Sequence, residues 1–202
     1  MPKTGLHIPL FPLNIFLLPG EQLPLHVFEP RYRQLFKEAE ENVLDFGLPC
    51  SESEIGVELV SICRLVRVVK RYSTGESDVI IEAKYVATMD RFETVFPQKL
   101  YPGGFVNLVG FDHLLKEPTE ELMSEFRTYI ELKFGTKPSP VNLGHYRFLD
   151  LAASVAMSNE EKMRLVLTKS TDKRNKQLTQ TLRYLNLLLK QERSIENGFI
   201  LN

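Results

Sequence analysis

The 202-residue chain has an ordinary globular composition, and its charge and cysteine content exclude several classes of protein. Hydrophobic residues make up 43% and charged residues 25% of the chain, and the formal net charge is −1 at pH 7. This balance argues against nucleic-acid binding through bulk electrostatics. Only Cys50 and Cys63 are present, which is too few for a disulfide framework, and their spacing is not that of a zinc site. We therefore expect a reduced, cytoplasmic protein.

The apolar stretch 6–18 is the one segment that could act as a secretion signal. Pro9 and Pro12 interrupt it, and no small-residue cleavage site follows. No run in the chain reaches the ~18 apolar residues that a membrane span needs. We expect neither secretion nor a membrane partner.

Prolines divide the first thirty residues into short apolar runs. Proline has no backbone N–H, so these runs are predicted to be edge or barrel strands, bent at the prolines and joined by a turn at Pro19-Gly20. Pro30 stands where a first helical turn accepts proline. An amphipathic helix of about three turns is predicted from the helical spacing of Tyr32, Leu35, Phe36 and Ala39.

The pattern of residues 55–115 is typical of strands. Period-two alternation in 57–72 and 79–88, around a turn at 72–77, predicts a long hairpin. The alternation places on one face Val60, Ile62, Val66 and Val68. We further expect a short strand at 91–96, a turn at 101–104 and a last strand at 105–115. Such strands suggest a small closed or half-closed barrel, because closure removes exposed edges.

Beyond Lys116 the spacing of apolar residues becomes helical. Thr119 is a predicted N-cap, Gly135 a predicted helix end, and Ser158 with Glu161 has the spacing of a capping box. Pro138 and Pro140 mark a connector, and a short helix is expected at 145–156. The longest helix is expected at 171–192, with a loosely held tail past Ser194. The sequence predicts an α+β protein with a β-rich domain over 1–117 and a helical domain over 118–202.

The N-terminal motifs resemble the substrate-binding N-terminal domain of Lon ATP-dependent proteases, and most of all the stand-alone bacterial proteins that keep only this domain. The matching pieces are Phe11-Pro12-Leu13, Leu18-Pro19-Gly20, Leu23-Pro24-Leu25 and Phe28-Glu29-Pro30-Arg31-Tyr32. The chain departs from the family pattern at 55–58 and 89–92, so strand registers there are not predicted. The resemblance implies a PUA-like β pseudo-barrel followed by a helical bundle. It also implies a module that binds unfolded or extended polypeptides, with a separate protease as a further partner.

Motifs of catalysis were sought, and we expect no enzyme, metal or cofactor. No Gly-x4-Gly-Lys-[Ser/Thr] loop is present. Ser170 and Lys173 match Ser-x-x-Lys, but the companion motifs are missing and a helix cap explains them better. The four histidines have no ligand spacing, and Cys50, although it could be exposed, is expected to be a bystander thiol.

Two surfaces are candidates for binding. Phe28, Arg31 and Tyr32 could form a rim for an extended peptide, since arginine offers forked donors and tyrosine a flat amphipathic ring. The alternative is that this segment is only a helix N-terminus, with Tyr32 packed inward. The second surface would bind RNA or a small ligand in a PUA-like cleft beside the basic last helix. With Tyr184 as the one aromatic residue in that helix, a nucleic-acid partner is not expected.

Overall fold

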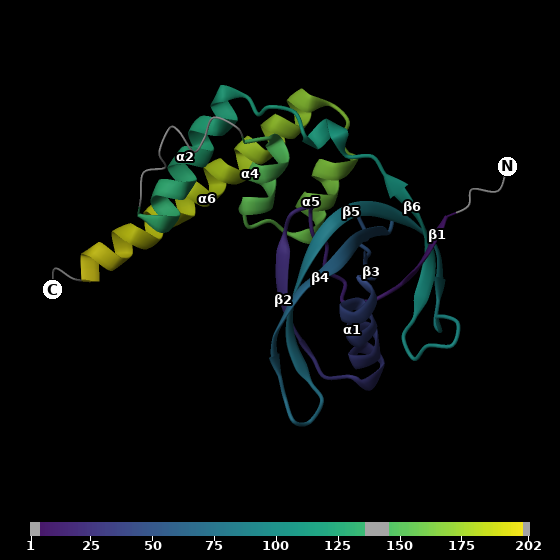
Figure 1. Ribbon diagram of the computed structural model, residues 1–202. Helices are drawn as coiled ribbons and strands as arrows, with labels where there is room; N and C mark the ends of the chain where they lie inside the picture. Colours follow the sequence, from purple (N-terminus) through teal and green to yellow (C-terminus); the bar gives the residue numbers. More distant parts are fainter. Residues whose placement is uncertain (1–4, 136–145, 200–202) are drawn as a thin grey trace. The chain divides into compact units, whose positions relative to one another are not determined.

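The computed structural model describes residues 5–135 and 146–199 (Figure 1). The predicted connector at Pro138 and Pro140, and His145, lie outside these residues. The chain divides into two compact units. The first comprises Met1–Phe111 and Ser158–Arg164, and the second comprises Asp112–Met157 and Leu165–Asn202. The domain boundary at 117 and 118 stays a prediction.

The first unit is an antiparallel sheet that closes on itself, so the predicted β pseudo-barrel and the α+β class are confirmed. In spatial order the strands are β1 (Leu6–Pro9), β6 (Gly103–Val109), β5 (Ser77–Glu93), β4 (Leu59–Arg71) and β3 (Asp45–Cys50). A parallel bridge between Leu10 and Gly47 joins the first strand to the last. β2 (Gln22–Val27) pairs with β5 beside this path.

Two glycines permit this closure. A Cβ on Gly47 would stand 2.6 Å from the Val60 side chain and 2.7 Å from that of Leu10. A Cβ on Gly104 would stand 2.7 Å from the backbone oxygen of Arg91. The turn predicted at 101–104 is therefore wrong at its second half, because β6 begins at Gly103 and uses glycine for a close approach to its neighbours.

The long hairpin is confirmed as β4 and β5, but its faces differ from the prediction. β5 continues to Glu93, so no separate strand begins at 91. Register shifts between Leu65 and Arg67, and between Val68 and Lys70, insert extra residues into β4. Each bulge breaks the period-two alternation. Val66 is consequently 44% exposed instead of sharing the buried face of Val60.

The helix at Pro30 is confirmed as α1 (Pro30–Asn42), with proline in its first turn. Its buried stripe consists of the four predicted residues Tyr32, Leu35, Phe36 and Ala39. These side chains belong to a hydrophobic core cluster that also contains Phe11 and Phe46. α1 ends at Val43, whose φ of 51° and ψ of 46° are left-handed.

The segment 158–164 holds the buried loop that precedes β2. Asn159 accepts a hydrogen bond from the Phe16 N–H at 2.9 Å and donates to the Asn14 carbonyl at 3.0 Å. Lys162 pairs with Glu21 at 2.8 Å, with side chains only 12% and 11% exposed. The Glu21 carboxylate also accepts the Leu18 N–H at 2.6 Å. The predicted capping box is confirmed, since Ser158 and Glu161 exchange hydrogen bonds of 2.8 and 3.2 Å.

The second unit is helical. After β6 the chain forms a short 3-10 helix, η1 (Asp112–Leu114), so the strand predicted at 105–115 ends early, at Val109. The helices of this unit include α2 (Glu120–Phe134), α4 (Phe148–Ser154) and α6 (Thr171–Phe199), and it holds the end of α5 (Asn159–Leu167), whose residues up to Arg164 belong to the first unit. The predicted cap at Thr119 and the end at Gly135 are confirmed. The tail predicted past Ser194 is wrong, because α6 continues as helix to Phe199.

Candidate functional site

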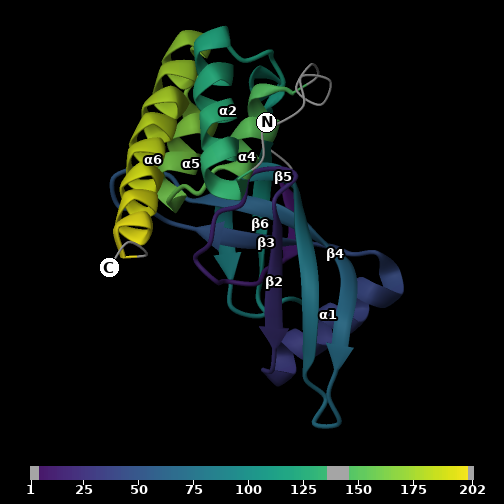
Figure 2. The same ribbon diagram turned by 90° about the vertical axis from the view of Figure 1, so that its left-hand side faces the viewer.

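A groove runs between α1 and β4 in the first unit. It consists of two adjoining hollows of about 250 and 300 Å³, which share Glu40, Val68 and Arg71. Arg33, Lys37 and Glu40 follow one another along the helical wall, and Leu65, Val68 and Arg71 along the strand wall. Figure 2 shows β2, β5 and β4 side by side, with β4 as the outer strand next to α1.

The strand wall of the groove is an unpaired edge. β3 pairs with β4 from Leu59 to Arg64, and the last pair is Asp45 with Arg64. From Leu65 to Arg71 β4 pairs with β5 on one side, and none of the described strands pairs with its other side. An unpaired edge offers backbone donors and acceptors to an incoming extended chain. The two bulges limit the regular ladder that such a chain could form, so pairing would be short.

Apolar side chains line the groove beside this edge. Leu65 and Val68 pack against the core, whereas the two bulge residues are exposed, Val66 by 44% and Val69 by 52%. Val43 lines the same hollow as Val66 and is 64% exposed. A β-branched residue rarely adopts a left-handed backbone, at a cost of roughly 1–2 kcal/mol. Such outliers cluster at binding sites, and Val43 is thus a candidate apolar contact.

Polar contacts hold the groove in shape. Arg71 and Glu40 form an ion pair of 2.5 Å that joins the two walls. Arg33 donates from Nε to the Phe28 carbonyl at 2.6 Å and from Nη1 to the Thr74 carbonyl at 2.8 Å, so α1 is tied to the hairpin turn. A binding site that is already ordered avoids part of the entropy cost of binding.

The three residues predicted as a peptide rim lie at the N-terminal end of α1, but they differ in exposure. Phe28 is 56% exposed, and its ring stacks on His26 at 6.2 Å. Arg31 pairs with Glu29 at 2.8 Å and lies 4.6 Å from the Tyr32 ring. Tyr32 itself is only 4% exposed and packs 4.4 Å from Phe11. The Tyr32 ring therefore packs inward, as the alternative of a plain helix N-terminus predicts, and supports Arg31 from below. It is not exposed for contact with a peptide.

A hydrogen-bonded cluster stands at the end of β2 next to the hairpin turn. His26 bonds Asp78 through Nδ1 at 2.7 Å and lies 3.4 Å from Glu76, and the Tyr72 hydroxyl donates to Asp78 at 2.8 Å. The hydrogen bond to Asp78 raises the pKa of His26 above its usual 6.5. The same bond lowers the pKa of Asp78.

The cysteines and the Ser-x-x-Lys motif are structural. Both thiols are buried, and burial raises the pKa of Cys50 to about 11 and that of Cys63 further. Such thiols carry little nucleophilic thiolate at neutral pH. Ser170 accepts a hydrogen bond from the Lys173 N–H at 3.4 Å, which confirms the predicted cap of α6. Within residues 5–135 and 146–199, no group of three or more His, Cys, Asp or Glu is placed to hold a metal ion.

The basic last helix of the second unit is largely occupied by its own neighbours. Arg174 is 1% exposed and donates to the carbonyls of Thr168 and His113, at 2.6 Å each. Arg183 pairs with Glu121 and Glu125 at 2.7 and 2.9 Å. A polar hollow of about 300 Å³ lies between α2 and α6, and its lining includes the acids Glu121 and Asp172 and the cations Lys176 and Arg183. The two arginines Arg174 and Arg183 are thus engaged within this unit.

The fold and the groove define a β pseudo-barrel with an open strand edge, followed along the chain by a helical unit. The model of the ATP-dependent protease La (LON) substrate-binding domain matches residues 7–183. The chain belongs to this family. In the described part of the chain, no helix is both long and apolar enough to cross a membrane.

Two solved structures share the fold. A Lon N-terminal domain protein from Xanthomonas campestris superposes with a TM-score of 0.61 at 21% identity, covering 86% of this chain and 96% of that one. The N-terminal domain of Mycobacterium avium complex Lon protease superposes with a TM-score of 0.58 at 14% identity, covering 88% and 98%. A search of curated protein sequences finds no match.

The open edge of β4 was missed by sequence reasoning. The β4 sequence gives no sign that its pairing with β3 ends at the pair Asp45 and Arg64, because the extent of that pairing depends on β3 and not on β4. One local signal was present. Val66 and Val69 are three positions apart, so a period of two cannot place both on the same face.

Proposed function

We propose that the protein binds unfolded or extended polypeptide segments without catalysis, and that the segment adds to the open edge of β4 in the α1–β4 groove. The observation that carries this proposal is the unpaired edge from Leu65 to Arg71, which faces a helix across a groove with both apolar and charged lining residues. Domains that bind peptides by strand addition obtain affinity from main-chain hydrogen bonds and selectivity from side-chain pockets. Membership of the substrate-binding family supports the same choice of ligand.

Phe28 and Arg31 would extend the contact beyond the groove. Arg33 ties the Phe28 carbonyl to the hairpin turn that closes one end of the groove. Phe28 offers an exposed ring, and Arg31 offers donors that are shared only with Glu29. Tyr32 would act by supporting Arg31 from the core. Delivery of the bound segment to a separate protease is a further part of this proposal.

Hydrogen exchange tests the proposed edge directly. The purified protein is compared with and without a reduced, chemically unfolded model polypeptide. Backbone amides that gain a partner exchange more slowly. We expect new protection in 65–71, with smaller changes along α1. Protection elsewhere, or none in a well-folded protein, would overturn the proposed site.

A charged substitution provides the matched test. Val66→Lys places an ammonium group beside the edge, the device by which natural edge strands reject partners. Affinity for the unfolded polypeptide is expected to fall about tenfold, which corresponds to about 1.4 kcal/mol. Val57→Lys is the control, since Val57 is 41% exposed and lies outside the groove, against 44% for Val66. Equal losses in the two variants would mean that the edge is not the site.

A further inference from the structure

The outer face of β4 carries three basic residues in one row. Residues directly opposite one another in antiparallel strands share a face of the sheet. Arg64, Arg67 and Lys70 stand opposite Glu82, Ile80 and Asp78 of β5 respectively. Because Glu82, Ile80 and Asp78 alternate along β5, they share one face, and their three partners on β4 share it too. The two bulges produce this arrangement, since they give that part of β4 a period of three.

Two of the three basic residues have acidic partners in the sheet. Arg64 forms a forked pair with Asp45, its partner on β3, at 2.7 and 2.9 Å. This pair raises the pKa of Arg64. Lys70 stands opposite Asp78, and its ammonium lies 4.4 Å from the Tyr72 ring.

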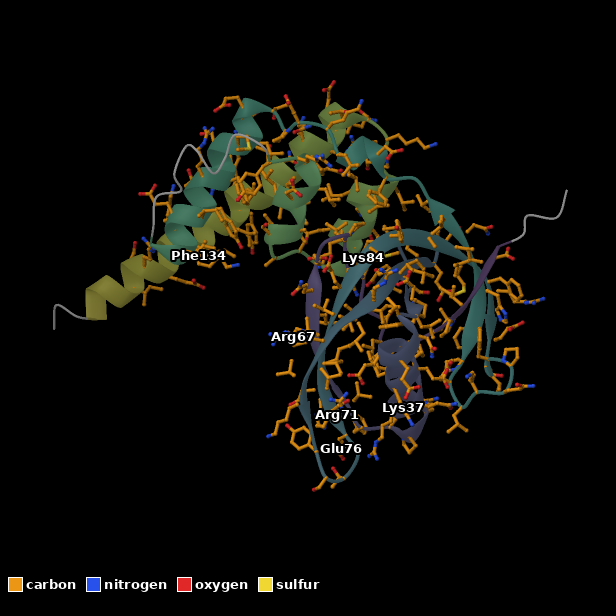
Figure 3. All side chains as sticks on the ribbon, in the orientation of Figure 1. Lys37, Arg67, Arg71, Glu76, Lys84 and Phe134 are labelled. Carbon is orange, nitrogen blue, oxygen red and sulfur yellow. The ribbon has the colours of Figure 1, made fainter. Side chains whose placement is uncertain are left out.

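Arg67 is the exception. Its partner on β5 is Ile80, whose own partner on β2 is Pro24, so its row across the sheet contains no acid. Among the ion pairs of the described residues, none involves Arg67. Figure 3 shows its side chain directed away from α1, on the opposite side of β4 from Lys37. On the side of β4 away from β5, Arg64 has Asp45 of β3 as its neighbour. At Arg67 that side of β4 is the open edge, because β3 no longer pairs there.

We infer that the groove prefers extended segments with aliphatic residues on one face and an acidic residue on the other, opposite Arg67. Alternate side chains of an added strand lie on opposite faces of the sheet. One set would meet the apolar groove at Val43 and Val68. A carboxylate in the other set would pair with Arg67 in the way that Asp45 pairs with Arg64, the preceding basic residue of the row. This inference rests on the proposed strand addition and names its substrate class.

The remaining charges of the groove agree with this preference. Apart from Arg67, whose side chain is directed to the outer face, its lining includes the cations Arg33, Lys37 and Arg71 and the acids Glu40 and Glu76. Both acids are already engaged, Glu40 by Arg71 and Glu76 by Arg33 and His26. The lining is thus positive overall, whereas the whole chain has a net charge of −1. Complementary charge of this kind gives specificity more than affinity.

The test uses three short Thr/Val peptides that are identical except for a central Asp, Asn or Lys. Fluorescence anisotropy at low salt measures binding to the full chain. We expect the Asp peptide to bind about three- to fivefold more tightly than the Asn peptide, the upper part of the range for an exposed ion pair. Arg67→Gln should abolish this ratio, and Arg67→Glu should transfer the preference to the Lys peptide. That exchange of preference would not arise from a structural role of Arg67.

Arg91→Gln is the control, because Arg91 is 64% exposed on β5 and pairs with Glu93. It should leave the ratio between peptides unchanged. Equal binding of all three peptides by the unmodified protein, or an equal loss for all three in Arg67→Gln, would overturn the acidic preference and leave strand addition standing. Failure of every peptide to bind would overturn both proposals.

Discussion

Replacing Lys162 with methionine tests how strongly the segment 158–164 is held in the first unit. Lys162 and Glu21 lie 2.8 Å apart with side chains 12% and 11% exposed. Lys162→Met keeps the length and helix propensity of the side chain but leaves the Glu21 carboxylate without its cation. Removing one partner of a fully buried pair costs about 3–5 kcal/mol. Since this pair retains some contact with water, we expect a loss of about 2–3 kcal/mol.

Equilibrium denaturation in urea, followed by circular dichroism and by the chemical shifts of the first unit, measures this loss. Arg164→Met is the control in the same helix. Its side chain is 47% exposed and pairs with Glu54 at 3.2 Å, with Glu54 71% exposed. Such surface pairs contribute about 0.2–1 kcal/mol. Arg164 also pairs with Glu160 at 2.6 Å on the helix surface, and we expect Arg164→Met to change the free energy of unfolding by about 1 kcal/mol at most.

The double variant Lys162→Met with Glu21→Gln separates charge from packing. Glutamine can still accept the Leu18 N–H, which the Glu21 carboxylate accepts at 2.6 Å. It carries no buried charge, so the double variant should recover about half of the loss, about 1 kcal/mol. Equal small effects of Lys162→Met and Arg164→Met, or no recovery in the double variant, would refute the reasoning.

Two further predictions concern titrating groups. Ellman's reagent at pH 8 should not label the native protein and should label both Cys50 and Cys63 after denaturation, because both thiols are buried and the pKa of Cys50 is about 11; one rapidly reacting thiol in the native state would contradict this. For His26, an NMR titration should give a pKa above 6.5, and Asp78→Asn should lower that pKa because it removes the main hydrogen bond to the imidazolium. The sign follows: a raised folded-state pKa stabilises the protein below pH 6.5, and this contribution is lost as the pH rises through the folded-state pKa. An unchanged His26 titration in Asp78→Asn would show that this bond is not its cause.

Local chemistry was enough to predict the helices. Pro30 and the spacing of Tyr32, Leu35, Phe36 and Ala39 determine both where α1 begins and which face it buries. Thr119 and Gly135 cap α2 through contacts with residues at most four positions away. These outcomes depend on short segments, so the sequence alone contains the information.

The barrel strands needed partners that lie far away in the sequence. Gly103 and Gly104 look like a turn, yet Gly104 is the point where β6 approaches the Arg91 backbone. Cys50 follows a proline and could have been exposed, yet it is buried in β3. In each case the deciding contact comes from another strand, which no local pattern reveals.

The sequence by itself determined the family, the α+β class and the start of α1, because these depend on motifs and on nearest-neighbour periodicity. Only the tertiary structure decided the candidate site. β3 ends opposite Arg64, and two bulges set Leu65 and Val68 inward and Arg67 outward. α1 then lies beside the remaining edge. Strand register and strand ends result from pairing between distant segments. The groove exists because β4 extends beyond the residues that pair with β3.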